Sequence, residues 1–294
     1  QMGNPDLKWQ RTLNNNFGLT AAFLDSRFNL SFDFYSNTTY DMLMSVNLPP
    51  SVGTTSMNVN FGQLNNKGLD LSLSAQIIRN KDWFWSMTLT GGHVMDQIRK
   101  ISQGLKNDID NPYDSSKPKI LFVEGGSQYD IYAMRSAGID PATGKEIFIK
   151  KNGEYTFKYD ENERVAVGNT NPILQGSWMN TVRYKGFSIS LATSYTFGSD
   201  YYNSTLKNKV ENIDLDYNVD RRVFTDRWKQ PGDHTRFLGI GTSSSSSQYS
   251  ERFVEKRNEL YISSIQVMYD FAPKAITRLG LRKLAIGFGL SDIA

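Results

Sequence analysis

Histidine, cysteine and carboxylate side chains are the residue types that most often bind a metal, transfer protons or act as a nucleophile. The chain has 294 residues, with two histidines, His93 and His234, and no cysteine. The lack of cysteine excludes thiol catalysis and thiolate metal sites. The two histidines lie far apart in the sequence, and no motif around them supports a His-rich metal site or a Ser-His-Asp triad. We therefore predict no catalytic residue, no metal site and no cofactor, so the protein is not expected to be an enzyme.

Two acidic clusters carry the oxygen ligands that calcium prefers. The first consists of Asp108, Asp110 and Asp114, and the second of Asp160, Glu161 and Glu163. Neither cluster has the spacing of a calcium loop, which ends in a bidentate glutamate. We interpret both as solvated loop charge.

Alternation of side chains is the strongest pattern in the chain. In residues 187–197, large apolar side chains such as Phe187, Ile189 and Leu191 occupy one parity, and small polar ones such as Ser188 and Ser190 occupy the other. Successive side chains of a β-strand point to opposite faces, so one face of this strand is apolar and the other polar. The pattern recurs along the chain, in segments of the length that transmembrane β-barrel strands have.

The predicted strands cover residues 7–23, 28–44, 58–77, 83–95, 176–184, 187–200, 260–271 and 282–290. Residues 120–123, 128–134 and 146–149 are either further strands or ordered loop structure. Tight turns at residues 25–26, 80–82 and 185–186 alternate with long polar stretches at residues 47–58, 96–175 and 200–258. Outer-membrane barrels have short periplasmic turns and long extracellular loops. The sequence therefore predicts an all-β, antiparallel transmembrane barrel in the bacterial outer membrane, with its long loops outside the cell.

The size of the polar side chains bears on the width of this barrel. Eight strands could close a minimal barrel, whose interior is just wide enough for side chains. Here the inward face is largely serine, threonine, glycine and alanine, which would leave such an interior unfilled. We therefore expect an arc of a wider barrel that other strands complete, because open sheet edges are not stable in lipid. The net charge of +3, spread along the chain, predicts no nucleic-acid partner.

Aromatic residues in the long loops are the candidates for binding. They are Tyr201, Tyr202, Tyr217 and Trp228. Their rings could stack on sugars or pack against a partner protein. Packing of one loop on another explains each of them equally well.

Short motifs also follow one another in an order that resembles a known family. Residues 4–9 read NPDLKW, residues 137–144 read AGIDPATG, and residues 168–172 read GNTNP. After residues 184–187, which read YKGF, come Trp228 with PGD at 231–233, RFV at 252–254 and LGL at 279–281. The order and spacing resemble the SusC/RagA-like TonB-dependent outer-membrane transporters. The turn residues that carry the resemblance are Gly138, Asp140, Pro141, Gly144, Asn171 and Pro172.

The resemblance implies that residues 1–294 are the C-terminal portion of a plugged barrel of roughly 22 strands. We expect the plug, the earlier strands and the closing strand to lie outside this chain. The expected partners are a SusD-like surface lipoprotein, outer-membrane lipid, a glycan or oligopeptide cargo, and TonB-ExbB-ExbD through a part of the protein absent here. The function implied is nutrient import. Two alternatives stay open: a SusC-like scaffold in an assembly or secretion complex, and a small self-contained porin or adhesin.

Overall fold

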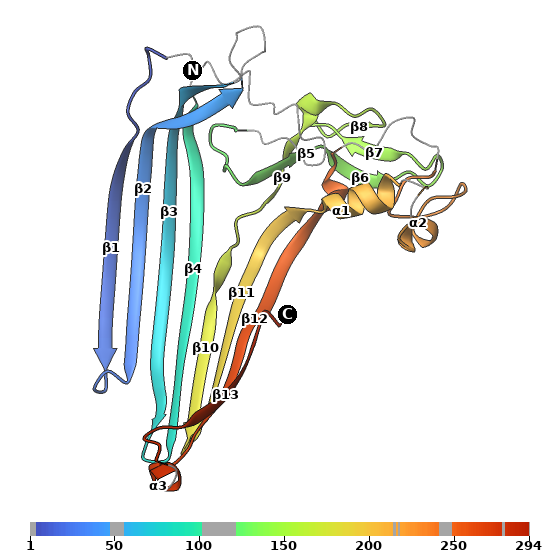
Figure 1. Cartoon of the computed structure of the whole chain (residues 1–294). Coiled ribbons are helices and arrows are strands. Elements are labelled where there is room, and N and C mark those ends of the chain that lie inside the picture. The colour runs from blue at the N-terminus through green and yellow to red at the C-terminus, as the bar shows by residue number, and fades with distance from the viewer. Residues whose placement is uncertain are drawn as a thin grey trace.

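One antiparallel sheet of eight strands dominates the structure (Figure 1). The computed structural model describes residues 4–47, 56–101, 122–213, 216, 218–240, 249–277 and 280–293. The strands, in sheet order, are β1 (Arg11–Phe23), β2 (Phe28–Asn47), β3 (Ser56–Arg79), β4 (Trp83–Ile101), β10 (Leu174–Tyr184), β11 (Phe187–Tyr202), β12 (Val254–Asp270) and β13 (Ala285–Ser291). The order runs from β1 to β13 without joining them, so this sheet is an open arc. No helix in the described ranges has the length and apolar character that crossing a membrane requires.

All eight predicted strands are present, and most extend further than predicted. β3 begins at Ser56, β4 continues to Ile101 and β12 begins at Val254. Strand pairing thus extends into segments that the sequence predicts as loops. Of the three additional segments, 128–134 contains β5 (Asp130–Ala133) and 146–149 is β7 (Glu146–Ile149). Residues 120 and 121 lie outside the described residues, while 122 and 123 are not in a strand.

Short turns join the strands at one end of the sheet, which we call the turn end and which is at the bottom of Figure 1. Asn80 Oδ1 accepts hydrogen bonds from the backbone N–H groups of Asp82 (3.1 Å) and Trp83 (2.7 Å) and so closes the β3–β4 turn. The other two tight turns use left-handed backbone conformations. The non-glycine residues with positive φ there are Leu24, Asp25, Ser26 and Lys185. The β12–β13 connection contains α3 (Pro273–Ile276).

The register of the strands aligns residues of the same type in rows, so that the sheet has an apolar face and a polar face. Leu30, Leu73 and Leu89 are paired in one row across β2, β3 and β4. One position further along, Ser31, Ser72 and Thr90 are paired in a row on the other face. Large side chains on the apolar face are exposed in this chain; for example, Phe17 is 62% and Leu19 is 54% exposed. The predicted alternation therefore holds over most of the sheet.

Two β-bulges change the alternation at places where the sequence pattern is wrong. Strict alternation counted from Ile265 and Val267 would put Tyr261 on the apolar face, but the pairing skips Ser263, so Tyr261 lies opposite Ser194 on the polar face. Leu260 and Ile262 take the apolar positions instead. A second bulge skips Ile77. One unpaired residue reverses the faces of all residues beyond it, because the side-chain period of a strand is two.

The end opposite the turns, which we call the loop end, carries a second layer of structure. β5 pairs with β9 (Val165–Asn169), and β7 pairs with both β6 (Arg135–Ile139) and β8 (Tyr155–Thr156). The β11–β12 connection adds α1 (Ser204–Leu206), a π-helical turn at Lys207–Glu211 and α2 (Arg222–Thr225). We call the described parts of residues 122–173 and 203–253 the loop body; Figure 1 shows the two segments side by side.

A small apolar cluster lies where β3 and β4 reach the loop end. It consists of Phe61, Leu64, Ile98 and Ile101. The ring of Phe122 meets that of Phe61 edge to face at 4.9 Å between centroids. Residue Ile98 also exchanges backbone hydrogen bonds with Gly125 (2.8 Å) and Gly126 (2.9 Å). The first described residues of the loop body are thereby attached to the edge of β4.

Candidate functional site

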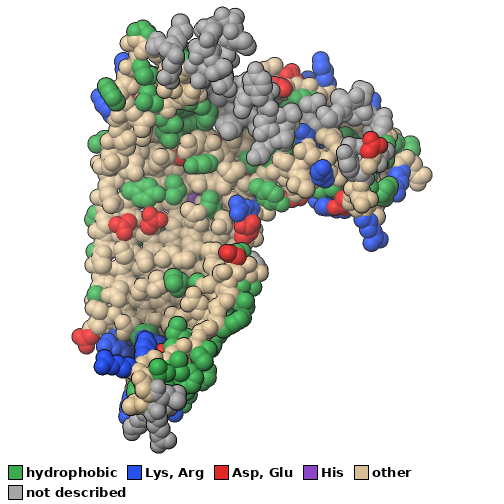
Figure 2. Space-filling view, in the orientation of Figure 1, with side chains coloured by type: hydrophobic (Ala, Val, Ile, Leu, Met, Phe, Trp, Pro, Cys, Tyr) green, Lys and Arg blue, Asp and Glu red, His purple; other side chains and the backbone are tan. Residues whose placement is uncertain are grey.

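The polar face of the sheet is the first candidate surface. Its hydroxyl side chains pair across neighbouring strands: Thr90 Oγ1 is 2.8 Å from Ser177 Oγ, and Thr181 Oγ1 is 3.1 Å from Ser190 Oγ. Figure 2 shows this face, on which apolar side chains are sparse and acidic side chains gather. A wall of small hydroxyls presents donors and acceptors without filling the space in front of it.

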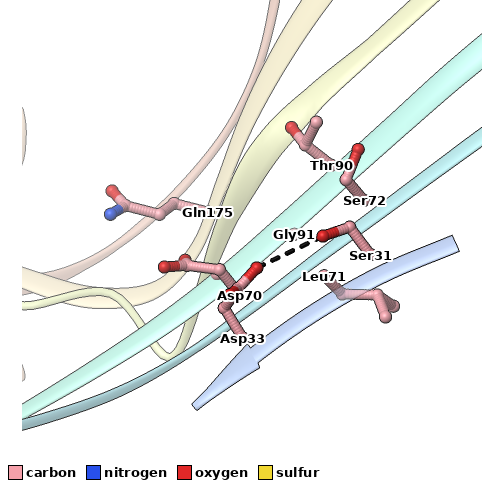
Figure 3. Close-up of a pocket in the computed structure, with 9 residues that line it drawn as sticks. Ser31, Asp33, Asp70, Leu71, Ser72, Thr90, Gly91 and Gln175 are labelled. Atoms are coloured by element: carbon pink, nitrogen blue, oxygen red, sulfur yellow. Dashed lines mark hydrogen bonds between the residues drawn. The ribbon is translucent and has the colours of Figure 1, made fainter. Parts of the chain in front are cut away.

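Asp33 and Asp70 are the charged residues at the centre of this face, directly opposite each other on β2 and β3. They lie in a hollow of about 350 Å³ together with hydroxyl groups of three strands (Figure 3). Ser31 Oγ donates to Asp33 Oδ2 at 3.2 Å. The carboxylates lean apart over glycines: a Cβ at Gly18 would be 2.6 Å from Asp33 Oδ1, and one at Gly92 would be 2.6 Å from Asp70 Oδ1. The glycines give these like charges the room to separate.

This hollow can accept hydrogen bonds and attract positive charge. Two carboxylates have acceptor capacity for ammonium, guanidinium or sugar hydroxyl groups, and the surrounding hydroxyls can both donate and accept. Across the described residues, no group of three or more His, Asp or Glu side chains is placed to hold a metal ion. The surface is therefore suited to reversible contacts with a passing polar molecule.

A buried charge cluster joins the two halves of the loop body. Arg252 lies 2.8 Å from Glu146 and 2.7 Å from Glu211, and all three side chains are at least nine-tenths buried. Burial alone lowers the pKa of the Arg252 guanidinium, but the two carboxylates outweigh that effect and raise its pKa. Nearby, the buried Arg227 donates to the carbonyl oxygens of Leu238 (3.0 Å) and Glu211 (2.7 Å). The cluster ties β7, the π-helical turn and the 3-10 turn at Glu251–Phe253, just before β12, into one unit.

Two of the motifs that carry the family resemblance meet in the loop body. The Trp228 indole Nε1 donates to the carbonyl oxygen of Pro141 at 2.9 Å, and Gly232 N–H donates to the same oxygen at 2.9 Å. Asp140 closes its turn by accepting hydrogen bonds, and those from Thr143 and Ala142 hold the pKa of its carboxyl below the ordinary value. The DPATG turn is thus covered by the segment around residue 228.

Gly144→Ala is expected to loosen this contact. Gly144 has φ +69°, and an added Cβ would overlap the Trp228 indole ring at Cδ2. Gly153→Ala is the matched control, because Gly153 has a similar φ of +89° but nothing within 4 Å of an added Cβ. In both variants an alanine must adopt the left-handed backbone conformation, which costs roughly 1–2 kcal/mol. Only Gly144→Ala should speed tryptic cleavage after Arg227 and Lys229 in the full-length protein; equal cleavage of both variants would contradict this.

The aromatic residues predicted as binding candidates lie in different environments in the structure. Trp228 packs on the DPATG turn. Tyr202, the last residue of β11, packs against the loop body with its ring 6.0 Å from that of Phe253, and burial raises the pKa of its phenol. Tyr201 is 38% exposed, and its hydroxyl donates to Glu255 at 2.8 Å. Tyr217 lies outside the described residues. A binding role for these four residues stays a prediction.

The remaining predicted residues occupy turns and local networks. Gly138 has φ +98°. Asn171 Nδ2 donates to the carbonyl oxygen of Val94 on β4 at 2.9 Å, just before β10 begins, and Pro172 follows it. In the second acidic cluster, Glu163 accepts a hydrogen bond from the backbone of Lys151 at 2.7 Å. The first acidic cluster lies outside the described residues.

Asp33, Asp70 and the Arg252 cluster are functional candidates that are not predicted from the sequence. A signal existed for the two aspartates, because each is a charged residue at a polar position inside an alternating strand. Arg252 lies in the RFV motif, but nothing in the sequence marks Glu146 and Glu211 as its partners, because the three residues come from distant parts of the sequence.

A two-faced antiparallel sheet with tight turns at one end and folded loops at the other is the wall of a membrane β-barrel. The chain belongs to the TonB-dependent receptor β-barrel family: the model described as "TonB dependent receptor-like, beta-barrel" matches residues 1–213.

Relatives and solved structures agree with this assignment. TonB-dependent receptor P39 of Formosa agariphila is 25% identical over the whole of this chain and 32% of its own length. TonB-dependent receptor SusC of Bacteroides thetaiotaomicron is 26% identical over 91% of this chain and 27% of its own. The structure of the RagAB peptide transporter superposes with a TM-score of 0.86 at 24% identity, covering all of this chain and 32% of that one. The resemblance to SusC/RagA-like transporters is confirmed, and this chain spans about a third of such proteins.

Proposed function

We propose that this chain forms part of the wall and outer loops of an outer-membrane importer that takes up glycans or oligopeptides. The observation that carries the proposal is the division of the sheet into an apolar face, exposed in this chain, and a face of small hydroxyls with an aspartate pair. Lipid covers the first face, and the second lines the path of the cargo. Transport by such a wall needs shape and hydrogen bonding rather than bond-making residues.

We further propose that the loop body is the docking surface for a partner protein that acts as a lid. Its two segments are held by a buried charge cluster and by the Trp228 contact, so they present a preformed surface rather than mobile loops. The proposed partner is a SusD-like surface lipoprotein that docks there on the outside of the cell. TonB-ExbB-ExbD would act on other parts of the full-length protein.

Purification of the full-length protein from outer membranes, combined with uptake assays, tests this proposal. We expect a surface lipoprotein to co-purify and deletion of the gene to abolish uptake of one class of oligosaccharide or oligopeptide. A scaffold would instead co-purify with assembly or secretion components, and its deletion would leave uptake of all cargo unchanged. That second result would refute import.

Asp33→Asn combined with Asp70→Asn is expected to reduce uptake of a cationic oligopeptide by about fivefold at low salt, the effect of losing roughly 1 kcal/mol of attraction. Uptake of a neutral peptide of equal length should change little, because asparagine keeps the size and much of the hydrogen bonding. The control is Asp25→Asn with Asp82→Asn, two exposed aspartates in the turns. Equal losses for both peptides would show that the pair does not act through charge.

A further inference from the structure

An aromatic row crosses the apolar face at the turn end of the sheet. Trp83, Tyr184, Phe187 and Tyr269 are paired one after another across β4, β10, β11 and β12. The rings of Trp83 and Tyr184 are 4.3 Å apart, and those of Phe187 and Tyr269 are 4.5 Å apart, between centroids. Aromatic rings of this kind gather at the headgroup level of a bilayer.

Basic side chains cluster at the same end, within a few residues of that row. They are Arg27, Arg79, Lys81, Arg183, Lys185, Arg282 and Lys283, which we call the basic rim, and the acidic residues there are Asp25, Asp82 and Asp270. Figure 2 shows Lys and Arg side chains gathered at this end. Lys185 Nζ lies 5.2 Å from the ring centre of Tyr184, so the charge and the aromatic row are adjacent.

None of the cations of the basic rim forms an ion pair with a described acidic residue. All ion pairs between described residues lie toward the loop end, such as Arg11–Asp41, Arg236–Glu255 and Lys256–Asp200. Arg27 donates to the carbonyl oxygens of Gln76 and Ile77, which leaves its positive charge uncompensated. Lys81, Lys185 and Lys283 are all exposed. The seven basic and three acidic side chains named above therefore leave net positive charge at the turn end.

We propose that the basic rim binds the phosphate groups of anionic phospholipids in the leaflet that meets the turn end. This inference rests on the proposed function, because the apolar face must be in lipid for the aromatic row to lie at headgroup level. Lysines next to that row extend their stems along apolar surface and place their ammonium groups among the phosphates. Attraction to an anionic leaflet is worth about 1 kcal/mol per basic residue near the surface, and it decays within a Debye length. An acidic protein segment is the alternative ligand for the basic rim, but its binding would not require an aromatic row beside the positive charge.

The test uses the full-length protein in phosphatidylcholine vesicles that contain a minor fraction of phosphatidylglycerol. Native mass spectrometry of the extracted protein gives the preference for bound phosphatidylglycerol over phosphatidylcholine. The variant Lys81→Gln/Lys185→Gln/Lys283→Gln is compared with Lys8→Gln/Lys67→Gln/Lys100→Gln, which removes the same charge from exposed lysines away from the turn end. We expect the preference to fall by about fivefold per lysine in the first variant, with little change in the second.

An equal fall in both variants, or no fall in the first, would overturn the inference while leaving the barrel wall intact. Added salt should reduce the preference of the unchanged protein more than that of the turn-end variant. Protection from protease shows whether each variant has inserted into the vesicles. If the unchanged protein does not insert at all, the proposed function fails, and this inference fails with it.

Discussion

Arg252→Met is expected to open the loop body, with a local loss of about 3–5 kcal/mol, because it leaves the buried carboxylates of Glu146 and Glu211 without their shared cation. Methionine keeps the length and apolar stem of the side chain, so the loss reports charge rather than volume. Hydrogen exchange of the full-length protein should then be at least about a hundredfold faster in β7 and in residues 203–213.

The control for this result is Arg257→Met. Arg257 pairs with Glu259 at 2.8 Å, but both side chains are about half exposed, and such a pair contributes about 0–1 kcal/mol. Adding Glu146→Gln and Glu211→Gln to Arg252→Met should recover part of the protection, because neutral side chains can be buried at lower cost. If Arg252→Met and Arg257→Met gave the same exchange rates, the cluster would not be what holds the loop body together.

Leu73→Arg is expected to cost about 2–4 kcal/mol of barrel stability, the penalty for a cation on the lipid face near the bilayer midplane. Leu73 lies between Leu30 and Leu89 on the apolar face. Ser72→Arg, one residue away on the polar face, should cost little, because it lies beside Asp33 and Asp70. Figure 3 shows the serine of this strand together with the two aspartates.

Urea unfolding of the full-length protein from vesicles measures both values. A large penalty at residue 73 with a small one at residue 72 assigns the apolar face to lipid. Similar penalties at both positions would mean that the apolar face is covered by protein instead. The two substitutions introduce the same side chain, so differences in its size or hydration cannot account for the contrast.

Most of the sheet could be predicted from the sequence, because side-chain alternation and turn residues are features of short, continuous segments. Phe187, Ile189 and Leu191 alternate with serines, and the Lys185–Gly186 turn supplies the left-handed residue that a tight hairpin needs. The bulge at Ser263 could not be predicted in this way. Neighbouring strands determine where one residue is skipped, and nothing in the residues themselves shows it.

The candidate site depends on contacts between distant segments, and this explains what was missed. Asp33 and Asp70 occupy positions that the alternation predicts to be on the polar face. That they lie opposite each other depends on the register between β2 and β3. Trp228 is a candidate for binding when the sequence is considered alone. In the structure it covers Pro141 and Gly144, 84 or more residues earlier, so its environment depends on tertiary packing.

The length of β3 has a consequence for the architecture of the whole transporter. A strand crosses a bilayer in about 9–11 residues, whereas β3 has 24. More than half of it therefore stands beyond the hydrocarbon, as a rigid collar above the membrane surface. The cluster around Phe61 and Ile98 belongs to that collar and obeys the packing rules of a water-soluble protein. The proposed lid protein would therefore rest on this collar and not at the bilayer surface.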